Sequence, residues 1–343
     1  MAAPRQPLRR TLAAAVALLT LAAAGCGDDA AAGGSQATEL RYQGSVGQVT
    51  LPELAADLGY LGDIRLNWIG NVTGGPADIQ ATATGQSDFG GAFNGAIVKL
   101  AAANAPITAV VSYYGSDAQT FQGYYVLDGS PIRGPRDLIG RKVGMNTLGA
   151  HAEAVLKTWL VKGGLTAEEI PKVELVALPP VNTEQSLRQR QIDVAVLGGV
   201  IRDKAIANGG IRPVFTDYEL LGAFSAGSYV FRDDFIKRNP ETVKAFVTGV
   251  GRAIEWARTQ PRQTVVARFE SIIAKRGRNE DPSLVRYWKS SGVAGQGGVI
   301  TDREFATWID WLADAGELKG AKPKPSDLYT NRFNGLPSGG GGA

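Results

Sequence analysis

The sequence predicts an α/β protein of two doubly wound lobes that the chain joins at two crossovers. Strands and helices alternate from residue 39 to residue 215, which is typical of sheets covered by helices on both faces. The same order of elements occurs twice, with similar short motifs in the two halves. A chain of 343 residues is also long enough for two such lobes.

The first half of the pattern begins with a strand at residues 39–43. Further strands are expected at 64–69, 87–90 and 107–112, with helices at 51–60, 77–84 and 94–104. The second half has expected strands at 142–145, 173–178, 193–197 and 213–215, and helices at 150–162, 183–190 and 200–208. Each half therefore predicts its own sheet.

A short motif occurs once in each half. Asp88 follows Gln86-Ser87 and precedes a strand, and Asp193 follows Gln191-Ile192 in the same setting, 105 positions later. This shared step from helix through turn and aspartate to strand predicts two lobes of similar plan.

The lobes are expected to share the chain unequally. The extended segments 123–127 and 227–231 are interpreted as crossovers, which gives lobe 1 residues 39–127 and 226–334, and lobe 2 residues 128–225. Helices complete lobe 1. Asn239-Pro240 predicts a helix start, Thr301 and Glu304 predict a capping box, and Gly316 predicts a helix end. Residues 335–343 are expected to be disordered.

The first 38 residues predict export. Residues 1–25 have the basic start, apolar middle and small-residue end of a secretory signal peptide. Cys26, the only cysteine, follows in a run that resembles a bacterial lipobox, so it is expected to be lipidated and to anchor the chain to the membrane. The alternative is a chance cysteine in a plain secreted signal. Residues 26–38 are expected to form a flexible tether, and without a second cysteine no internal disulfide can form.

The charge of the chain gives no indication of a polyanionic partner. The formal net charge of +3 comes from Arg5, Arg9 and Arg10, and the rest of the chain has 33 basic and 33 acidic residues. A neutral folded part predicts no nucleic-acid partner.

Four segments carry a resemblance to a known family: Tyr42–Ser45, Gly85–Gly90, Ser130–Gly144 and Asn146–His151. Over roughly residues 39–330 the chain resembles the substrate-binding proteins of ABC importers for sulfonates, nitrate, taurine and thiamine precursors. The resemblance implies the type II fold of periplasmic binding proteins, no cofactor, a small-molecule ligand, and an ABC permease and ATPase as partners. It places the chain on the outer face of the cytoplasmic membrane, and the protein is expected to be a monomer.

One departure from the family bears on the ligand. Family members selective for sulfonates often carry a Trp-Asp-Pro-like run after the strand that begins near Asp193, where this chain has Gly198-Gly199-Val200. A bulky wall and a carboxylate are missing there. The ligand is therefore expected to be larger, or less cationic, than taurine.

The candidate ligand site lies beyond the carboxyl ends of the strands, in the cleft between the lobes. Glycines, short polar side chains and aromatic rings are placed there to approach, hydrogen-bond and enclose a ligand, with helix N-termini available to an anion. The candidates are Ser45, Val46, Gly75, Phe93, Asn94, Tyr113, Asn146, Thr147, Gly149 and Gly198. The alternative is that the glycines and asparagines only form tight turns and the rings only pack.

His151 and Arg202 are weighed separately. His151 is the only histidine, so neither a Cys/His dyad nor a histidine metal cluster is expected, and no metal site is predicted. His151 is expected in the first turn of a helix at the cleft edge, with direct ligand contact as the alternative. Arg202 is expected on a solvated helix face, with pairing to a ligand carboxylate or sulfonate as the alternative.

The favoured function is a non-catalytic receptor for a small organic anion or heteroaromatic compound of the sulfonate, nitrate and taurine class. An enzyme on the same fold, forming a pyrimidine precursor or removing sulfinate, is the main alternative. A lipid-anchored sensor or adhesion module is the third. The export signal and the absence of a Cys/His pair in the mature chain favour the receptor.

Overall fold

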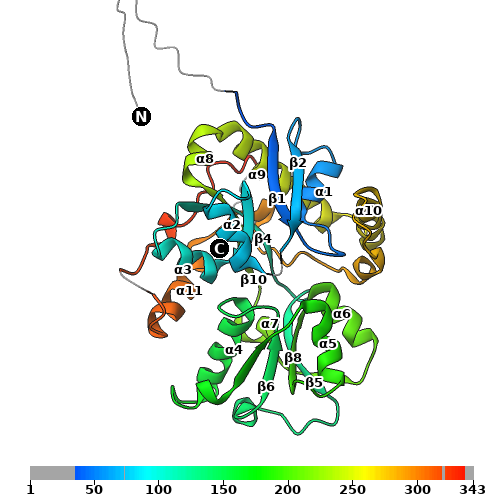
Figure 1. Cartoon of the computed structure of the whole chain (residues 1–343), viewed down its shortest axis with the longest axis vertical. Coiled ribbons are helices and arrows are strands. Elements are labelled where there is room, and N and C mark those ends of the chain that lie inside the picture. Colours follow the sequence, from blue (N-terminus) through cyan, green and yellow to red (C-terminus); the bar gives the residue numbers. More distant parts are fainter. Residues whose placement is uncertain (1–34, 73, 319–320, 337–343) are drawn as a thin grey trace, which may run out of the picture. The chain divides into compact units, whose positions relative to one another are not determined.

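A computed structural model describes residues 35–72, 74–318 and 321–336 of the 343-residue chain (Figure 1). Its contacts divide the chain into Met1–Ser35 and Gln36–Ala343, and the description below concerns the second unit. The predicted signal peptide, Cys26 and most of the predicted tether lie outside the described residues, as does most of the predicted disordered tail.

The first lobe contains two small sheets. β1 (Glu39–Gly44) runs parallel to β2 (Arg65–Asn71). β10 (Phe224–Arg232) lies between β3 (Phe89–Phe93) and β4 (Ile107–Ser116) and is antiparallel to both. The helices of this lobe are α1 (Leu51–Asp57), α2 (Gly75–Ala83), α3 (Asn94–Ala102), α8 (Asp233–Arg238), α9 (Pro240–Thr259), α10 (Arg262–Lys275) and α11 (Asp302–Asp314).

The second lobe contains one five-stranded sheet with strand order β7-β6-β8-β5-β9. Its strands are β5 (Gln122–Leu127), β6 (Lys142–Met145), β7 (Glu174–Ala177), β8 (Val194–Gly198) and β9 (Ile211–Thr216), and its helices are α4 (His151–Lys162), α5 (Pro180–Arg188), α6 (Gly199–Ala207) and α7 (Asp217–Leu221). Short 3-10 helices are η1 (Pro135–Leu138), η2 (Ile170–Lys172), η3 (Pro282–Tyr287), η4 (Gln296–Gly298) and η5 (Pro325–Asp327). The predicted fold class, two α/β lobes, is confirmed.

The two segments interpreted as crossovers are instead strands inside the sheets. β5 pairs with β8 and β9, and β10 pairs with β3 and β4, all antiparallel. A parallel neighbour needs a helical connection, whereas a strand that enters directly from the other lobe needs none and can pair antiparallel. The limits of the two lobes remain a proposal. From these pairings we place the two boundaries near residues 121 and 223, whereas the sequence analysis placed them at 127 and 225.

The repeated aspartates occupy equivalent positions in the two lobes. Asp88 accepts a hydrogen bond from the backbone N–H of Arg41 at 2.7 Å, and Asp193 accepts one from that of Lys142 at 2.9 Å. In each case the aspartate N–H donates back to the carbonyl of the same residue, at 2.9 Å. Each aspartate thus fixes the start of one strand against its neighbour.

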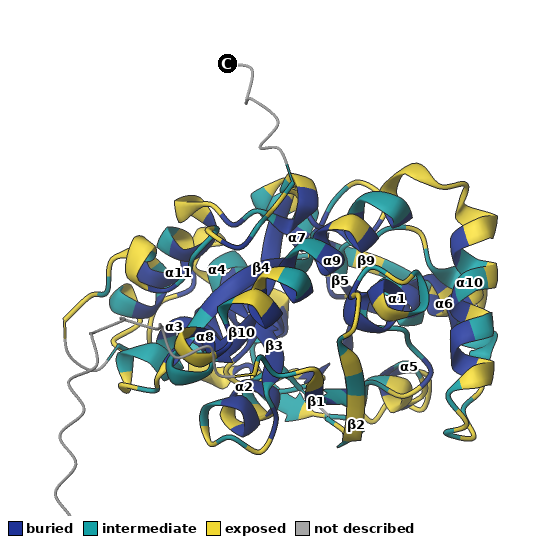
Figure 2. Ribbon diagram, turned by 90° about the horizontal axis from the view of Figure 1, so that it is seen from above, coloured by how far each residue is buried: buried dark blue, intermediate teal, exposed yellow. Residues whose placement is uncertain are grey.

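The core of the first lobe lies under α9 and along β10, whose residues are nearly all buried (Figure 2). Phe89, Phe231 and Phe246 meet there, with ring centroids 4.6 to 5.8 Å apart. Buried aromatic clusters of this kind contribute much of the apolar area that stabilises a lobe. None of the helices in the described part of the chain is long and apolar enough to cross a membrane.

The predicted ends of the C-terminal helices are found with one change in detail. Thr301 and Glu304 form the capping box at the start of α11, and Gly316 follows the helix with φ at 67°. α9 starts at Pro240, but the Asn239 side chain does not cap it. Its Oδ1 accepts the N–H of Ala37 at 2.9 Å, so Asn239 instead holds the segment that enters β1.

Candidate functional site

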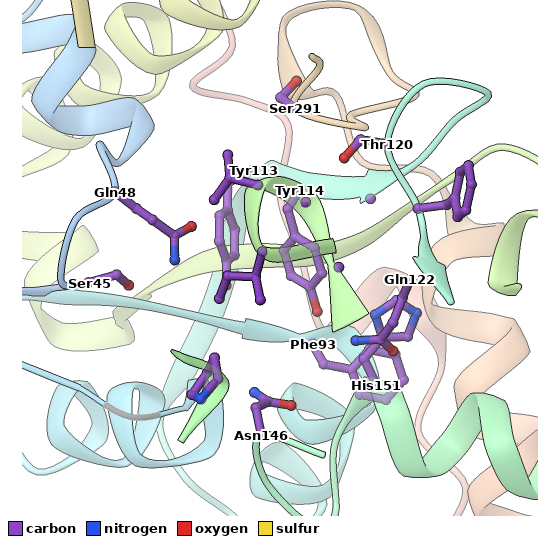
Figure 3. Close-up of a pocket in the computed structure, with 18 of the residues that line it drawn as sticks. Ser45, Gln48, Phe93, Tyr113, Tyr114, Thr120, Gln122, Asn146, His151 and Ser291 are labelled. Atoms are coloured by element: carbon purple, nitrogen blue, oxygen red, sulfur yellow. The ribbon is translucent and has the colours of Figure 1, made fainter. Parts of the chain in front are cut away.

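A cavity of about 450 Å³ lies between the two lobes (Figure 3). It is lined from the first lobe by residues at or after the ends of β1 and β3, and from the second lobe by residues at or after the ends of β6 and β8. The segment 288–291, which follows η3, also contributes to the lining. The cavity therefore lies beyond the carboxyl ends of strands from both lobes, where the sequence places the candidate ligand site.

Seven of the ten residues proposed from the sequence line this cavity: Ser45, Gly75, Phe93, Tyr113, Asn146, Thr147 and Gly198. Ser45 follows β1, Phe93 ends β3, and Asn146 follows β6. Gly75 needs to be glycine, because a Cβ there would lie 2.8 Å from the Cα of Ala92. The two sides of the cleft approach closely at Gly74, where a Cβ would lie 3.2 Å from Thr147.

Val46, Asn94 and Gly149 are not among the lining residues. The Val46 side chain is 55% exposed, on the turn outside the cavity. Asn94 is fully buried; its amide nitrogen donates to the Glu304 carbonyl and its oxygen accepts from Ser228. Gly149 has φ at 70°, and its N–H donates to the Glu153 side chain at 2.8 Å. The structure therefore does not place these three residues in the cavity, which corrects the expectation from the sequence. Asn94 and Gly149 stabilise local structure through these hydrogen bonds.

Tyrosines form one wall of the cavity. The rings of Tyr113 and Tyr229 stack with centroids 4.2 Å apart, and Tyr114 meets Tyr113 edge-on at 4.9 Å. Burial raises the pKa of all three phenols above the usual value. They therefore stay protonated at neutral pH and offer neutral O–H donors beside flat apolar surfaces. Tyr114 and Tyr229 were not proposed from the sequence.

His151 and Asp217 lie together at the cavity wall. His151 is the first residue of α4 and Asp217 the first of α7; the distance from His151 Nε2 to Asp217 Oδ2 is 3.2 Å. The expected first-turn position of His151 is found, and its ring stacks on Phe93 with centroids 5.4 Å apart. Asp217 was not proposed, although Thr216 and Glu219 form a capping box whose spacing could have placed a helix start there.

Four helices begin at the cavity without a side chain that caps their first N–H groups: α2, α4, α5 and α6. Each has a residue of its first turn in the lining. Uncapped N–H groups and the positive end of the helix dipole favour an anionic or hydrogen-bond-accepting group. By contrast, α1 is capped by Thr50 and Glu53.

Arg202 does not lie on a solvated face, and this expectation is wrong. The residue is 1% exposed, and its guanidinium bonds to Asp203 Oδ1 at 2.6 and 3.0 Å. It also donates to the carbonyls of Gln119 and Phe121, at 2.8 and 3.1 Å. These contacts occupy Arg202 within the protein, so it is not available to a ligand.

Lysine and arginine are scarce in the lining. Lys289 is the only such residue among the described lining residues, and its Nζ lies 3.1 Å from Asp203 Oδ1. Over residues 35–72, 74–318 and 321–336, no group of three or more His, Cys, Asp or Glu side chains is placed to hold a metal ion. The lining thus offers helix N-termini, hydroxyls, amides and one His–Asp pair.

Known proteins share the sequence and the fold. The chain is 26% identical over 278 residues to a protein of Brucella abortus (strain 2308) named "Putative binding protein", covering 75% of this chain and 78% of that protein. The structure of the present chain resembles that of the alkanesulfonate-binding protein SsuA of Xanthomonas axonopodis pv. citri bound to MOPS. The TM-score is 0.68 and the identity 16%, over 87% of this chain and all of the SsuA chain.

The same fold also occurs in an enzyme. The desulfurization enzyme DSZB aligns with a TM-score of 0.57 and 16% identity, over 87% of this chain and 97% of the enzyme. These likenesses show the two-lobed fold of periplasmic binding proteins. The family model described as NMT1/THI5 like matches residues 54–264, more than half of the sequence. The chain therefore belongs to the NMT1/THI5 like family.

Proposed function

We propose that the chain is an extracytoplasmic solute-binding lipoprotein of an ABC importer. It captures a small organic anion or related planar solute between its lobes and delivers it to a membrane permease. The observation that carries this proposal is the cavity itself, because both lobes line it and four uncapped helices begin at it. The relatives named as binding proteins support the same class.

The size and lining of the cavity favour an organic solute over a small inorganic ion. Its volume of about 450 Å³ is in the range of ligand pockets that enclose drug-sized molecules. Flat rings of Phe93, Tyr113 and Tyr229 can bury apolar surface, and Ser45, Asn146 and Thr147 can fix orientation by hydrogen bonds. A ligand held by both lobes favours the closed state by its contacts with both.

The enzyme alternative has a neighbour in DSZB but little support in the lining. His151 is the only histidine in the sequence, and its Nε2 lies 3.2 Å from Asp217 Oδ2. Within the described part of the chain, no serine or threonine hydroxyl bonds to His151, as an activated hydroxyl nucleophile would. A lipid-anchored sensor would have the same cavity. The receptor is distinguished from the sensor because solute uptake through the receptor requires an importer.

The test is a thermal-shift screen of the purified protein against sulfonates, carboxylates, nitrate, pyrimidines and amines, followed by calorimetry. A bound solute raises the unfolding temperature, and the rise grows with the logarithm of the ratio of solute concentration to dissociation constant. The proposal expects saturable binding of one compound class and its recovery without chemical change. Absence of binding in all five classes, or recovery of a converted product, would contradict it.

A further inference from the structure

Three polar atoms at one wall of the cavity have no hydrogen-bond partner among the described residues. They are His151 Nε2, Asp217 Oδ2 and Gln122 Oε1. His151 is 7% exposed and Asp217 is 0% exposed, so solvent has little access to either side chain. His151 Nε2 and Asp217 Oδ2 are 3.2 Å apart but are not aligned for a hydrogen bond. Buried polar groups without partners are rare because each loses its hydration without compensation.

The surrounding contacts hold these atoms in place. The other oxygen of Asp217 accepts from Ser116 Oγ at 2.9 Å and from the Gln122 N–H at 3.0 Å. The His151 ring stacks on Phe93 at an interplanar angle of 16°. Figure 3 shows His151 beside Phe93 and Gln122, with the hydroxyl end of Tyr114 pointing toward the same region. The side chains of this wall are therefore held in place, and Asp217 Oδ2 is left without a hydrogen-bond donor within the described part of the chain.

The chemistry of this wall differs from that of the helix N-termini. Asp217 Oδ2 and Gln122 Oε1 are hydrogen-bond acceptors, and a carboxylate repels a second anion brought within contact distance. An oxyanion placed against His151 Nε2 would also lie close to Asp217 Oδ2, since the two atoms are 3.2 Å apart. A ligand N–H placed there would instead satisfy the acceptors.

We propose that Asp217, supported by Gln122 and His151, is a specificity-determining residue that accepts a hydrogen bond from an N–H group of the ligand. The cognate solute is then an amine, amide, amidine or protonated ring nitrogen compound at this end. An acceptor or anionic group at its other end can meet the uncapped helices. Nitrate and alkanesulfonates without nitrogen are excluded as cognate ligands. This inference rests on the proposed receptor function.

Asp193, in the same lobe, is an aspartate whose two carboxylate oxygens both have polar partners. Asp193 Oδ2 accepts the Lys142 N–H at 2.9 Å, and Asp193 Oδ1 lies 3.6 Å from Arg141 Nη1. It is not a lining residue. The matched pair of variants is therefore Asp217→Asn, which replaces one acceptor oxygen by an N–H donor in the cavity, and Asp193→Asn, which makes the same change elsewhere in the lobe.

The experiment dialyses the wild-type protein and both variants against a low-molecular-weight metabolite extract of bacterial cells. Retained compounds are released by denaturation and identified by mass spectrometry, and unfolding temperatures are checked beforehand. The inference expects a compound that carries an N–H group. Asp217→Asn should weaken its retention by about tenfold or more, since a good partner becomes an opposed donor. Asp193→Asn should retain it like the wild type.

The contrary outcomes separate the two proposals. A retained compound without N–H, or equal retention by Asp217→Asn, overturns the role of Asp217 and leaves the receptor standing. Retention of no compound by the wild type counts against the receptor and the inference together. If Asp217→Asn does not fold, the wild type is titrated with the retained compound and with a form methylated at that nitrogen until it has no N–H. Equal affinities for the two would overturn the inference.

Discussion

The guanidinium carbon of Arg202 lies 3.8 Å from the centroid of the Phe121 ring. Arg202 belongs to α6 of the second lobe, and Phe121 lies in the segment that enters that lobe. Asp203 accepts from Arg202 and lies 3.1 Å from Lys289 Nζ, in the segment after η3. This charge cluster, in which Arg202 and Asp203 are buried, thus joins the second lobe, the segment before β5 and the C-terminal part of the first lobe.

The first prediction concerns this cluster. Asp203→Asn should lower the free energy of unfolding by about 3–5 kcal/mol, because it leaves the buried Arg202 charge without its anion. Urea denaturation measures the loss. As a control, Asp310→Asn removes the partner of Lys322 in an exposed pair and should change stability by about 0.5 kcal/mol or less. A loss below about 1 kcal/mol in Asp203→Asn would show that the cluster is not needed for folding.

The second prediction concerns pH. Burial raises the pKa of Asp78 to about 7, against a hydrogen bond from the Gly91 N–H that lowers it. The native state therefore keeps a proton between pH 4 and 7 that the unfolded chain releases, and wild-type stability falls as pH rises through this window.

Asp78→Asn cannot ionise, so its stability should not fall in that window. The free energy of unfolding of Asp78→Asn should equal that of the wild type at about pH 4. Above pH 7 it should exceed the wild-type value by at most about 4 kcal/mol. Chemical denaturation of both proteins from pH 4 to 8 measures this difference. A constant difference across the range would show that Asp78 titrates near its ordinary value.

The third prediction tests the contribution of Asn146, which lines the cavity after β6. Asn146→Ala should weaken ligand binding by about 1–3 kcal/mol if its amide pairs with a buried polar atom of the ligand. Calorimetry with the compound found in the screen measures the change. Asn208→Ala, at the far end of α6, is the matched control and should bind like the wild type. Equal affinity in both variants would remove Asn146 from the site.

The fourth prediction follows from the sequence before residue 35. Cys26→Ser should release the protein from the membrane and abolish labelling with a fatty acid analogue, because two acyl chains are needed for stable anchoring. Fractionation of cells that express each form measures the distribution. Retention of Cys26→Ser on the membrane at the wild-type level would refute lipid anchoring at this residue.

The order of strands and helices could be predicted from the sequence because it depends on local patterns. The capping box of Thr301 and Glu304 and the equivalent turns at Asp88 and Asp193 are local in the same sense. The pairing of β5 and β10 could not be predicted, because it depends on which sheet receives a strand after a crossover.

The direction of individual side chains was harder to predict than the position of the cleft. Phe93 and Asn94 are adjacent, yet Phe93 lines the cavity and Asn94 bonds to Ser228 in the core, 134 positions away in sequence. Arg202 is buried where its guanidinium donates to the backbone carbonyls of residues 81 and 83 positions upstream. Asp217 reaches the cavity wall where α7 lies against His151 of α4. Contacts between distant segments decide the direction of all three side chains.

We propose that the chain captures a solute between its lobes and releases it unchanged. Small-angle scattering of the purified protein, with and without the compound identified by thermal shift, tests it directly when the same sample is then analysed by mass spectrometry. We expect a smaller radius of gyration in the presence of the compound, and we expect the compound to be recovered intact after hours of incubation. An unchanged radius of gyration together with a converted product would contradict it and indicate an enzyme.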